Sequence, residues 1–207
     1  MDDSGLRDNL STKEKLFLGY IDLANCVTIL SVGLALSSCY FALTGALRTS
    51  VTLLILSGIC DLFDGAIARK IKRTDIEKTF GAQLDTVADV VSFGVTPAVI
   101  VFSIAGAVWY TLAASVFYII CAVIRLAYFN TTAVFDKLSH YNGLPVTYMA
   151  LILPVVLLFK SGIAGVTALV VVGLLFILNI KIPKPRGVWY AFFPVIAAVL
   201  IALWWLV

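Results

Sequence analysis

Charged side chains are scarce in this chain, and their scarcity excludes an ordinary soluble protein. They make up 13% of the 207 residues, whereas a soluble domain carries about 25%. Hydrophobic residues reach 61%, against a usual share of about 45–50%. So little surface charge cannot keep a chain of this length in solution, and we predict a single polytopic membrane domain. The net charge of +3 is uninformative by itself, and no nucleic-acid partner is expected.

A leader sequence and a cysteine motif are not expected either. Residues 1–15 are polar and contain no apolar core, so they do not predict a cleavable signal peptide. The four cysteines lack C-x-x-C spacing and lie in apolar surroundings, which argues against a metal or redox motif. We expect them to be small core residues, namely Cys26, Cys39, Cys60 and Cys121.

Long apolar runs fill most of the remaining chain and predict an all-α polytopic fold. A membrane-spanning helix needs about 20 apolar residues, and seven segments are candidates, of which the fifth is short. They cover roughly residues 22–47, 50–70, 82–105, 107–130, 144–160, 162–180 and 188–207. Before them, residues 10–21 are amphipathic and predict an interfacial helix on the inner leaflet, with a flexible tail as the alternative.

The distribution of Lys and Arg predicts which side of the membrane each connection faces. With a cytoplasmic N-terminus, thirteen of the fifteen basic residues lie on the cytoplasmic side, including those in the polar loop at residues 70–80. Only Arg48 and Lys160 then face outward. Because cytoplasmic loops carry an excess of Lys and Arg, we predict a multi-pass protein of the inner (cytoplasmic) membrane of the cell.

Four aspartates interrupt the second and third apolar segments. Asp61 and Asp64 are spaced i,i+3, and Asp85 and Asp89 are spaced i,i+4, so each pair shares one helix face. A short loop joins the two segments, so they are antiparallel neighbours with both pairs near the cytoplasmic end. Carboxylates inside a membrane are costly unless they are neutralised, and divalent cations are their natural partners. The four aspartates predict a site for two metal ions that clamps a phosphoryl group.

Small and basic residues beside the aspartates fit a phosphate ligand. Gly65 and Gly81 leave room for a phosphate, and Ala68 puts only a small side chain on the helix face that carries Asp64. Arg69 can hold a phosphate through two parallel hydrogen bonds, so the implied substrate has a pyrophosphate head and a lipid tail. Two alternatives are helix–helix packing for the glycines and pairing of the aspartates with basic residues, as in a transporter. These two segments carry no Lys or Arg at the depth of the aspartates, which favours metal.

The same residues form a longer signature. The pattern Asp-x-x-Asp-Gly-x-x-Ala-Arg, followed by Gly-x-x-x-Asp-x-x-x-Asp, resembles that of the CDP-alcohol phosphotransferase family. The chain has every position of it: Asp61, Asp64, Gly65, Ala68, Arg69, Gly81, Asp85 and Asp89. One feature departs from the family pattern, because the linker at residues 70–80 has eleven residues where the family usually has eight.

The resemblance implies a six-helix core, usually as a homodimer among membrane lipids. It implies that an alcohol hydroxyl attacks the β-phosphate of a CDP-linked substrate and releases CMP. Asp61, Asp64 and Asp85 would then bind two Mg²⁺ or Mn²⁺ ions, and Asp89 would be both a metal ligand and the general base. The CDP-lipid would contact Asn25, Thr28, Asp61, Gly65, Ala68, Arg69 and Gly81. The alternative for Asn25 is ordinary capping of the first helix.

Further segments resemble the members of the family that use serine, the CDP-diacylglycerol–serine O-phosphatidyltransferases. These segments are residues 91–97, 125–129, 142–145 and 180–185. Arg125 is the single cation in the fourth candidate span and is a candidate ligand for L-serine, with snorkelling to the headgroups as the alternative. Ser92 follows Asp89 by about one turn and is a second candidate, with a hydrogen bond to its own helix as the alternative.

These observations predict three parts of the chain and one reaction. The parts are an N-terminal cytoplasmic or interfacial segment (1–21), the six-helix core (22–187) and one additional C-terminal transmembrane helix (188–207). The predicted reaction transfers the phosphatidyl group of CDP-diacylglycerol to L-serine. Another acceptor, such as glycerol 3-phosphate, inositol, inositol phosphate or choline, is the alternative within the family. A metal-ion or proton transporter is the alternative of another class.

Overall fold

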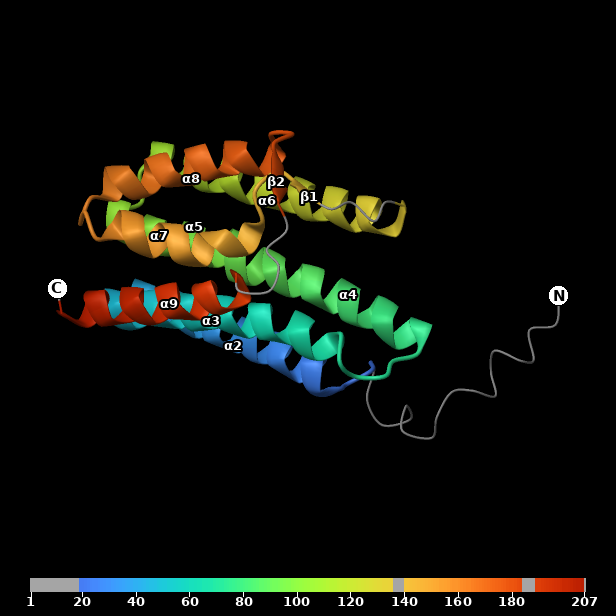
Figure 1. Cartoon of the computed structure of the whole chain (residues 1–207). Helices are drawn as coiled ribbons and strands as arrows, with labels where there is room; N and C mark the ends of the chain where they lie inside the picture. Colours follow the sequence, from blue (N-terminus) through green and yellow to red (C-terminus); the bar gives the residue numbers. More distant parts are fainter. Residues whose placement is uncertain (1–18, 136–139, 184–188, 207) are drawn as a thin grey trace.

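The chain is almost entirely helical over residues 19–135, 140–183 and 189–206, which the computed structural model describes. Its helices run side by side along one long axis (Figure 1). They are α2 (Leu23–Leu43), α3 (Leu47–Ala68), α4 (Asp75–Asp89), the π-helix η2 (Val90–Val95), α5 (Thr96–Ala105), α6 (Trp109–Phe135), the 3₁₀-helix η3 (Val146–Tyr148), α7 (Met149–Leu157), α8 (Gly162–Ile177) and α9 (Trp189–Leu206). Two short strands, β1 (His140–Asn142) and β2 (Lys181–Pro183), pair antiparallel.

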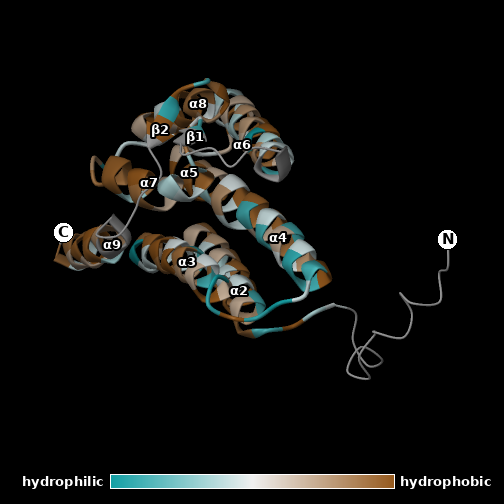
Figure 2. Cartoon of the chain, turned by 45° about the vertical axis from the view of Figure 1, so that its right-hand side comes forward, coloured by the Kyte–Doolittle hydropathy of each residue, from teal (hydrophilic) through white to brown (hydrophobic). Residues whose placement is uncertain are grey.

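The outer surface of this bundle is suited to lipid. Large apolar side chains such as Leu36, Leu112 and Leu174 are exposed. Hydrophobic residues predominate along the helices (Figure 2). Four helices are long and apolar enough to cross a membrane: Leu23–Leu43, Leu47–Ala68, Asp75–Ala105 and Trp109–Thr132. The prediction of an all-α multi-pass membrane protein is therefore confirmed.

The finer division of the chain stays a prediction. Three of the predicted spans correspond to apolar helices that are shorter than the four long ones, namely Val146–Leu157, Gly162–Ile177 and Phe192–Leu206. The six-helix core with one extra helix, and the boundaries at residues 21 and 187, rest on the sequence pattern. The predicted interfacial helix at residues 10–21 falls almost entirely outside the described residues, and residues 19–21 are not helical.

The start of the third predicted helix was placed too late. Residues 70–80 were predicted as a polar loop, but α4 begins at Asp75. A capping box explains this start: the Thr74 hydroxyl accepts a hydrogen bond from the Glu77 N–H, and the Glu77 carboxylate accepts one from the Thr74 N–H at 2.7 Å. The helix therefore extends beyond the apolar run, and its first turns carry the polar face seen in Figure 2.

The cysteines do not all lie in the core as predicted. Cys121 is buried, but Cys39 and Cys60 are half-buried and Cys26 is exposed. All four are free thiols. An apolar neighbourhood in the sequence does not distinguish a core face from a lipid face, because both are apolar in a membrane protein.

A seam of small polar residues brings α2 against α3. The buried residues of α2 recur every three or four positions and are nearly all small: Ala24, Asn25, Thr28, Ser31, Ala35, Ser38 and Ala42. Small side chains let two helices approach closely, and hydroxyls then hydrogen-bond across the interface. The Oγ atoms of Ser31 and Ser57 lie 2.9 Å apart, and those of Ser38 and Ser50 lie 3.1 Å apart. Thr28 belongs to the same seam, and its side chain faces α3.

Two local irregularities shape the region beside the aspartates. The π-helix η2 follows Asp89 directly, and the buried Tyr118 hydroxyl of α6 donates a hydrogen bond to the Phe93 carbonyl of this turn. Gly143 has φ +76, and a side chain there would collide with the Phe176 carbonyl. This glycine turn leads the chain from β1 into η3, which carries Thr147.

Candidate functional site

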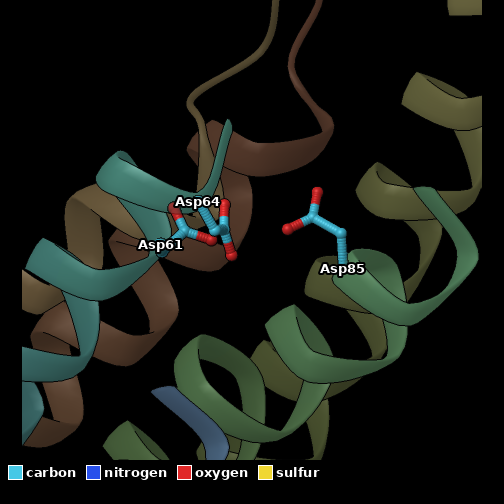
Figure 3. Close-up of side chains that lie close together, drawn as sticks. All are labelled: Asp61, Asp64 and Asp85. Carbon is cyan, nitrogen blue, oxygen red and sulfur yellow. The ribbon is translucent and has the colours of Figure 1, made fainter. Parts of the chain in front are cut away.

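Three of the four predicted aspartates meet where the end of α3 faces α4. Asp61 and Asp64 lie one turn apart before the end of α3, and Asp85 reaches toward them from α4 (Figure 3). One carboxylate oxygen from each of the three lies within 4.8 Å of the others. The i,i+3 spacing in α3 and the antiparallel neighbour therefore bring these carboxylates together as predicted.

The fourth aspartate lies beside the other three. Asp89 lies close enough to the cluster for the charges of Asp61 and Asp85 to act on it. Asp89 is the last residue of α4, immediately before the π-helix. All four aspartates thus belong to one group.

Two threonine hydroxyls hold the carboxylates of α3 in place. Thr28 of α2 donates a hydrogen bond of 2.6 Å to Asp64 Oδ2, and both side chains are buried. Thr147 of η3 donates one of 3.0 Å to Asp61 Oδ2. Because each hydroxyl donates, both contacts stabilise an ionised carboxylate and leave its second oxygen available to a ligand.

The composition of this cluster fits hard divalent cations. Its donors are carboxylate oxygens, which suit Mg²⁺ and Mn²⁺. Two oxygens bound to one Mg²⁺ lie at most about 4.2 Å apart, so a spacing within 4.8 Å requires only small side-chain adjustments. Asp61, Asp64, Asp85 and Asp89 are the residues that would hold the ions.

A pocket of about 390 Å³ opens beside the carboxylates. Asp64 and Asp85 line one side of it. Six residues predicted to bind the CDP-lipid line it as well: Asn25, Thr28, Gly65, Ala68, Arg69 and Gly81. The structure therefore brings these predicted residues together around one cavity, while their contacts with a nucleotide remain a prediction.

The two candidate serine ligands are both buried near Asp89. Arg125 of α6 is 6% exposed, stacks on the Phe129 ring at 4.9 Å, and its charge acts on Asp89. This burial disagrees with the alternative that Arg125 snorkels to the headgroups. Ser92 lies on η2 and is fully buried, and within the described residues its hydroxyl has no hydrogen-bond partner. The alternative of a hydrogen bond to its own helix is therefore not observed.

Asp22, not Asn25, caps the first described helix. The Asp22 side chain accepts a hydrogen bond of 2.9 Å from the Asn25 N–H, whereas Asn25 lies inside the first turn of α2. Asn25 instead donates to the Tyr20 carbonyl, and its side-chain oxygen faces Arg73. Burial alone would raise the pKa of Asp22, but the hydrogen bond and charge of Arg73 outweigh it and hold that pKa below its ordinary value.

The sequence reasoning overlooked two residues at the site, Thr147 and Arg73. Thr147 follows Pro145 in a short apolar helix, and a polar residue in such a place was the only available signal. Arg73 lines the pocket and belongs to the lengthened linker, which was predicted only to be a polar loop. Both reach the site through long-range contacts that no local pattern encodes.

Known proteins resemble this chain over most of its length. The family model for CDP-alcohol phosphatidyltransferases matches residues 21–206. The archaetidylserine synthase of Methanothermobacter thermautotrophicus is 29% identical over 177 residues, covering 84% of this chain and 75% of that protein. The CDP-diacylglycerol–serine O-phosphatidyltransferase of Methanocaldococcus jannaschii is 34% identical over 165 residues, covering 79% and 75%. The Saccharomyces cerevisiae protein of that name is 36% identical over 118 residues, covering 53% and 42%.

The family match and the geometry agree. The matched region contains the complete aspartate signature. Six of its eight residues line one pocket, and Asp61 lies in the same carboxylate cluster as two of them, Asp64 and Asp85. The transporter alternative is not supported, because the family model describes a group-transfer enzyme. The chain belongs to the CDP-alcohol phosphatidyltransferase family and is a membrane-embedded phosphotransferase.

Proposed function

We propose that this enzyme transfers the phosphatidyl group of CDP-diacylglycerol to the hydroxyl of L-serine and releases CMP. The observation that carries this proposal is the match to two relatives whose names specify serine, over 84% and 79% of this chain. The names differ in the lipid half, which is archaetidyl in one and diacylglycerol in the other. Serine is therefore the better supported half of the substrate pair.

The four aspartates would hold the metal ions that position the pyrophosphate of the substrate. Two divalent ions held by Asp61, Asp64, Asp85 and Asp89 would neutralise the pyrophosphate and the charge that develops on it. Thr28 and Thr147 keep the carboxylates of α3 oriented. Arg69, at the mouth of the same pocket, supplies a further cation for the phosphates.

Asp89 accepts the proton in the proposed reaction. The serine oxygen forms a bond to the β-phosphorus, and the bond from that phosphorus to the CMP oxygen breaks. The serine hydroxyl proton moves to an Oδ atom of Asp89 as the new bond forms. The buried Arg125, whose charge acts on Asp89, binds the serine carboxylate. The buried Ser92 hydroxyl provides a further contact with the serine substrate.

We further propose that the enzyme is a homodimer in the cytoplasmic membrane, with the N-terminus and the active site on the cytoplasmic side. The basic residues of the connection between α3 and α4, including Arg69, Lys70 and Lys72, support this orientation, because cytoplasmic loops carry an excess of positive charge.

The test is CMP release by the purified enzyme with each acceptor in turn. With CDP-diacylglycerol and Mn²⁺, we expect rapid CMP release with L-serine and at most background release with glycerol 3-phosphate, inositol, inositol phosphate or choline. Release with one of those alcohols but not with serine would refute serine as the acceptor. No metal-dependent CMP release with any acceptor would refute the reaction itself.

A further inference from the structure

The unassigned cation Arg73 lies inside the proposed nucleotide pocket. It belongs to the turn between α3 and α4, within the linker that is longer than the family pattern. Its side chain is only 8% exposed. One of its terminal nitrogens, Nη1, lies 3.0 Å from the place where a side chain on Gly81 would begin. The guanidinium therefore covers the open face of Gly81, which the family pattern assigns to the nucleotide.

The contacts of Arg73 are incomplete for a buried guanidinium. Nη2 donates to Asp22 Oδ1 at 2.7 Å and lies 3.4 Å from Asn25 Oδ1. Within the described residues, the buried Nε atom has no hydrogen-bond partner. A buried donor without an acceptor is unfavourable, so the present arrangement leaves capacity for another acceptor. Its anionic partner Asp22 is 27% exposed and stays hydrated when the pair separates.

The charge of the pocket favours an anionic ligand on the Arg73 side. Arg69, Arg73 and Lys78 line the pocket together with Asp64 and Asp85. Divalent ions would take up the charge of these two carboxylates, so the basic side of the pocket would attract phosphate groups. The planar fork of an arginine matches phosphate oxygens better than a lysine does.

We propose that Arg73 binds a phosphate of the CDP group and that Asp22 holds its guanidinium in place until the substrate enters. The inference rests on the proposed function, because it takes the ligand of the pocket to be a cytidine nucleotide. On binding, the substrate phosphate replaces the Asp22 carboxylate as the anion beside Arg73. Asp22 therefore competes with the substrate for the guanidinium.

A purely structural role for Arg73 predicts a different result. If the ion pair merely ties the start of α2 to the α3–α4 turn, loss of either partner has the same consequence. If Arg73 binds phosphate, loss of Arg73 weakens CDP binding, whereas loss of the Asp22 charge does not. Asp22→Asn separates these cases, because asparagine caps a helix as well as aspartate does and removes only the competing charge.

The experiment measures binding of CDP and of cytidine to the full-length enzyme in detergent with Mn²⁺, by calorimetry. We expect Arg73→Gln to weaken CDP binding at least tenfold and cytidine binding less than threefold. Asp22→Asn should leave CDP binding unchanged or tighten it. Arg73→Lys should fall between wild type and Arg73→Gln, and it replaces the Gln variant if that variant does not fold.

Three results would overturn the inference. Equal weakening of CDP binding by Arg73→Gln and Asp22→Asn would show a structural clamp. Equal weakening of CDP and cytidine binding by Arg73→Gln would show a contact with the nucleoside. Unchanged CDP binding in the Arg73 variants would show no contact. CMP release by the wild type is measured in parallel. If the wild type releases CMP, these three results concern Arg73 alone. If it does not, the proposed function fails, and the inference loses its basis as well.

Discussion

At the scale of single residues, neutral hydroxyls orient two of the carboxylates in the cluster. Asp61 and Asp64 come from the same helix, yet each is oriented by a hydroxyl from a different element, Thr147 of η3 and Thr28 of α2. The i,i+3 pattern predicted that Asp61 and Asp64 share one helix face, because a helix fixes its own faces. The partners could not be predicted, since their contacts depend on how distant segments pack.

Replacing Thr147 by valine should weaken metal binding while the protein stays folded. Valine keeps the shape but removes the hydroxyl that donates to Asp61. Loss of a contact that orients a metal ligand typically costs about 10- to 100-fold in affinity. We expect the Mn²⁺ concentration for half-maximal activity to rise at least about tenfold, whereas Thr147→Ser stays close to wild type. A valine variant with the wild-type Mn²⁺ dependence would show that this hydroxyl has no such role.

Replacing Arg125 by lysine should impair serine binding selectively. Lysine keeps the charge but loses the planar fork and the stacking on Phe129. A hydrogen bond to a charged group contributes about 1.5–3 kcal/mol, which corresponds to about tenfold or more. We expect the KM for serine to rise about tenfold and that for CDP-diacylglycerol less than twofold. Equal changes in both KM values would indicate a general disturbance of the site.

At the scale of elements, the apolar parts of the helices were predicted correctly, but several helix ends were not, above all the start of α4. Hydrophobicity marks the part of a helix that crosses the membrane. The residues from Asp75 to Phe80 are polar or mixed, so the predicted start of α4 lay too far along the chain. The sequence Thr74-Asp75-Ile76-Glu77 is a capping box and was the missed signal. The π-helix after Asp89 has no comparable local pattern, because it is fixed by contacts such as that between Tyr118 and Phe93.

The contact between α3 and α7 should tolerate no added methyl group. A side chain at Gly58 would begin 2.7 Å from the Ala150 Cβ, so the helices must separate. Overpacking of this kind costs about 1–3 kcal/mol, and in a chain of this size the Tm of Gly58→Ala should fall by about 2–10 °C. The displacement should also move η3, which precedes α7 and carries Thr147, and so raise the Mn²⁺ requirement.

The matched control for that variant is Gly33→Ala on α2. A side chain at Gly33 meets nothing within 4 Å, so alanine should leave the Tm unchanged or raise it slightly. Thermal unfolding in detergent and the Mn²⁺ dependence of activity measure both variants. Equal stability of the two variants would show that the α3–α7 contact is not tight.

At the scale of the whole molecule, the uneven distribution of positive charge supports the proposed orientation in the membrane. The positively charged connection between α3 and α4 lies beside the pocket, while Arg48 lies at the start of α3. A single sequence was enough to predict this asymmetry, because it requires only counting. It could not predict which helices share a dimer interface, since lipid-facing and partner-facing surfaces are equally apolar.

Cysteine labelling in intact cells tests the orientation. In a variant with the four native cysteines replaced, Lys72→Cys should be protected from a membrane-impermeant maleimide until the cells are opened. Arg48→Cys should react without opening, because it lies at the other end of α3. Both positions are exposed, so access and not burial decides the result. The reverse pattern would place the active site outside.

The most direct test of the account replaces each of the four aspartates by asparagine and measures activity beside thermal stability, with and without Mn²⁺. Each substitution keeps the shape but removes one charge from the cluster, so activity should fall at least about a hundredfold. The variants should fold, because losing a buried carboxylate lessens the desolvation cost without metal. Mn²⁺ should raise the Tm of the wild type and raise that of each variant less. An active Asp64→Asn or Asp85→Asn variant, or a wild type that Mn²⁺ does not stabilise, would contradict the metal-binding role of the cluster.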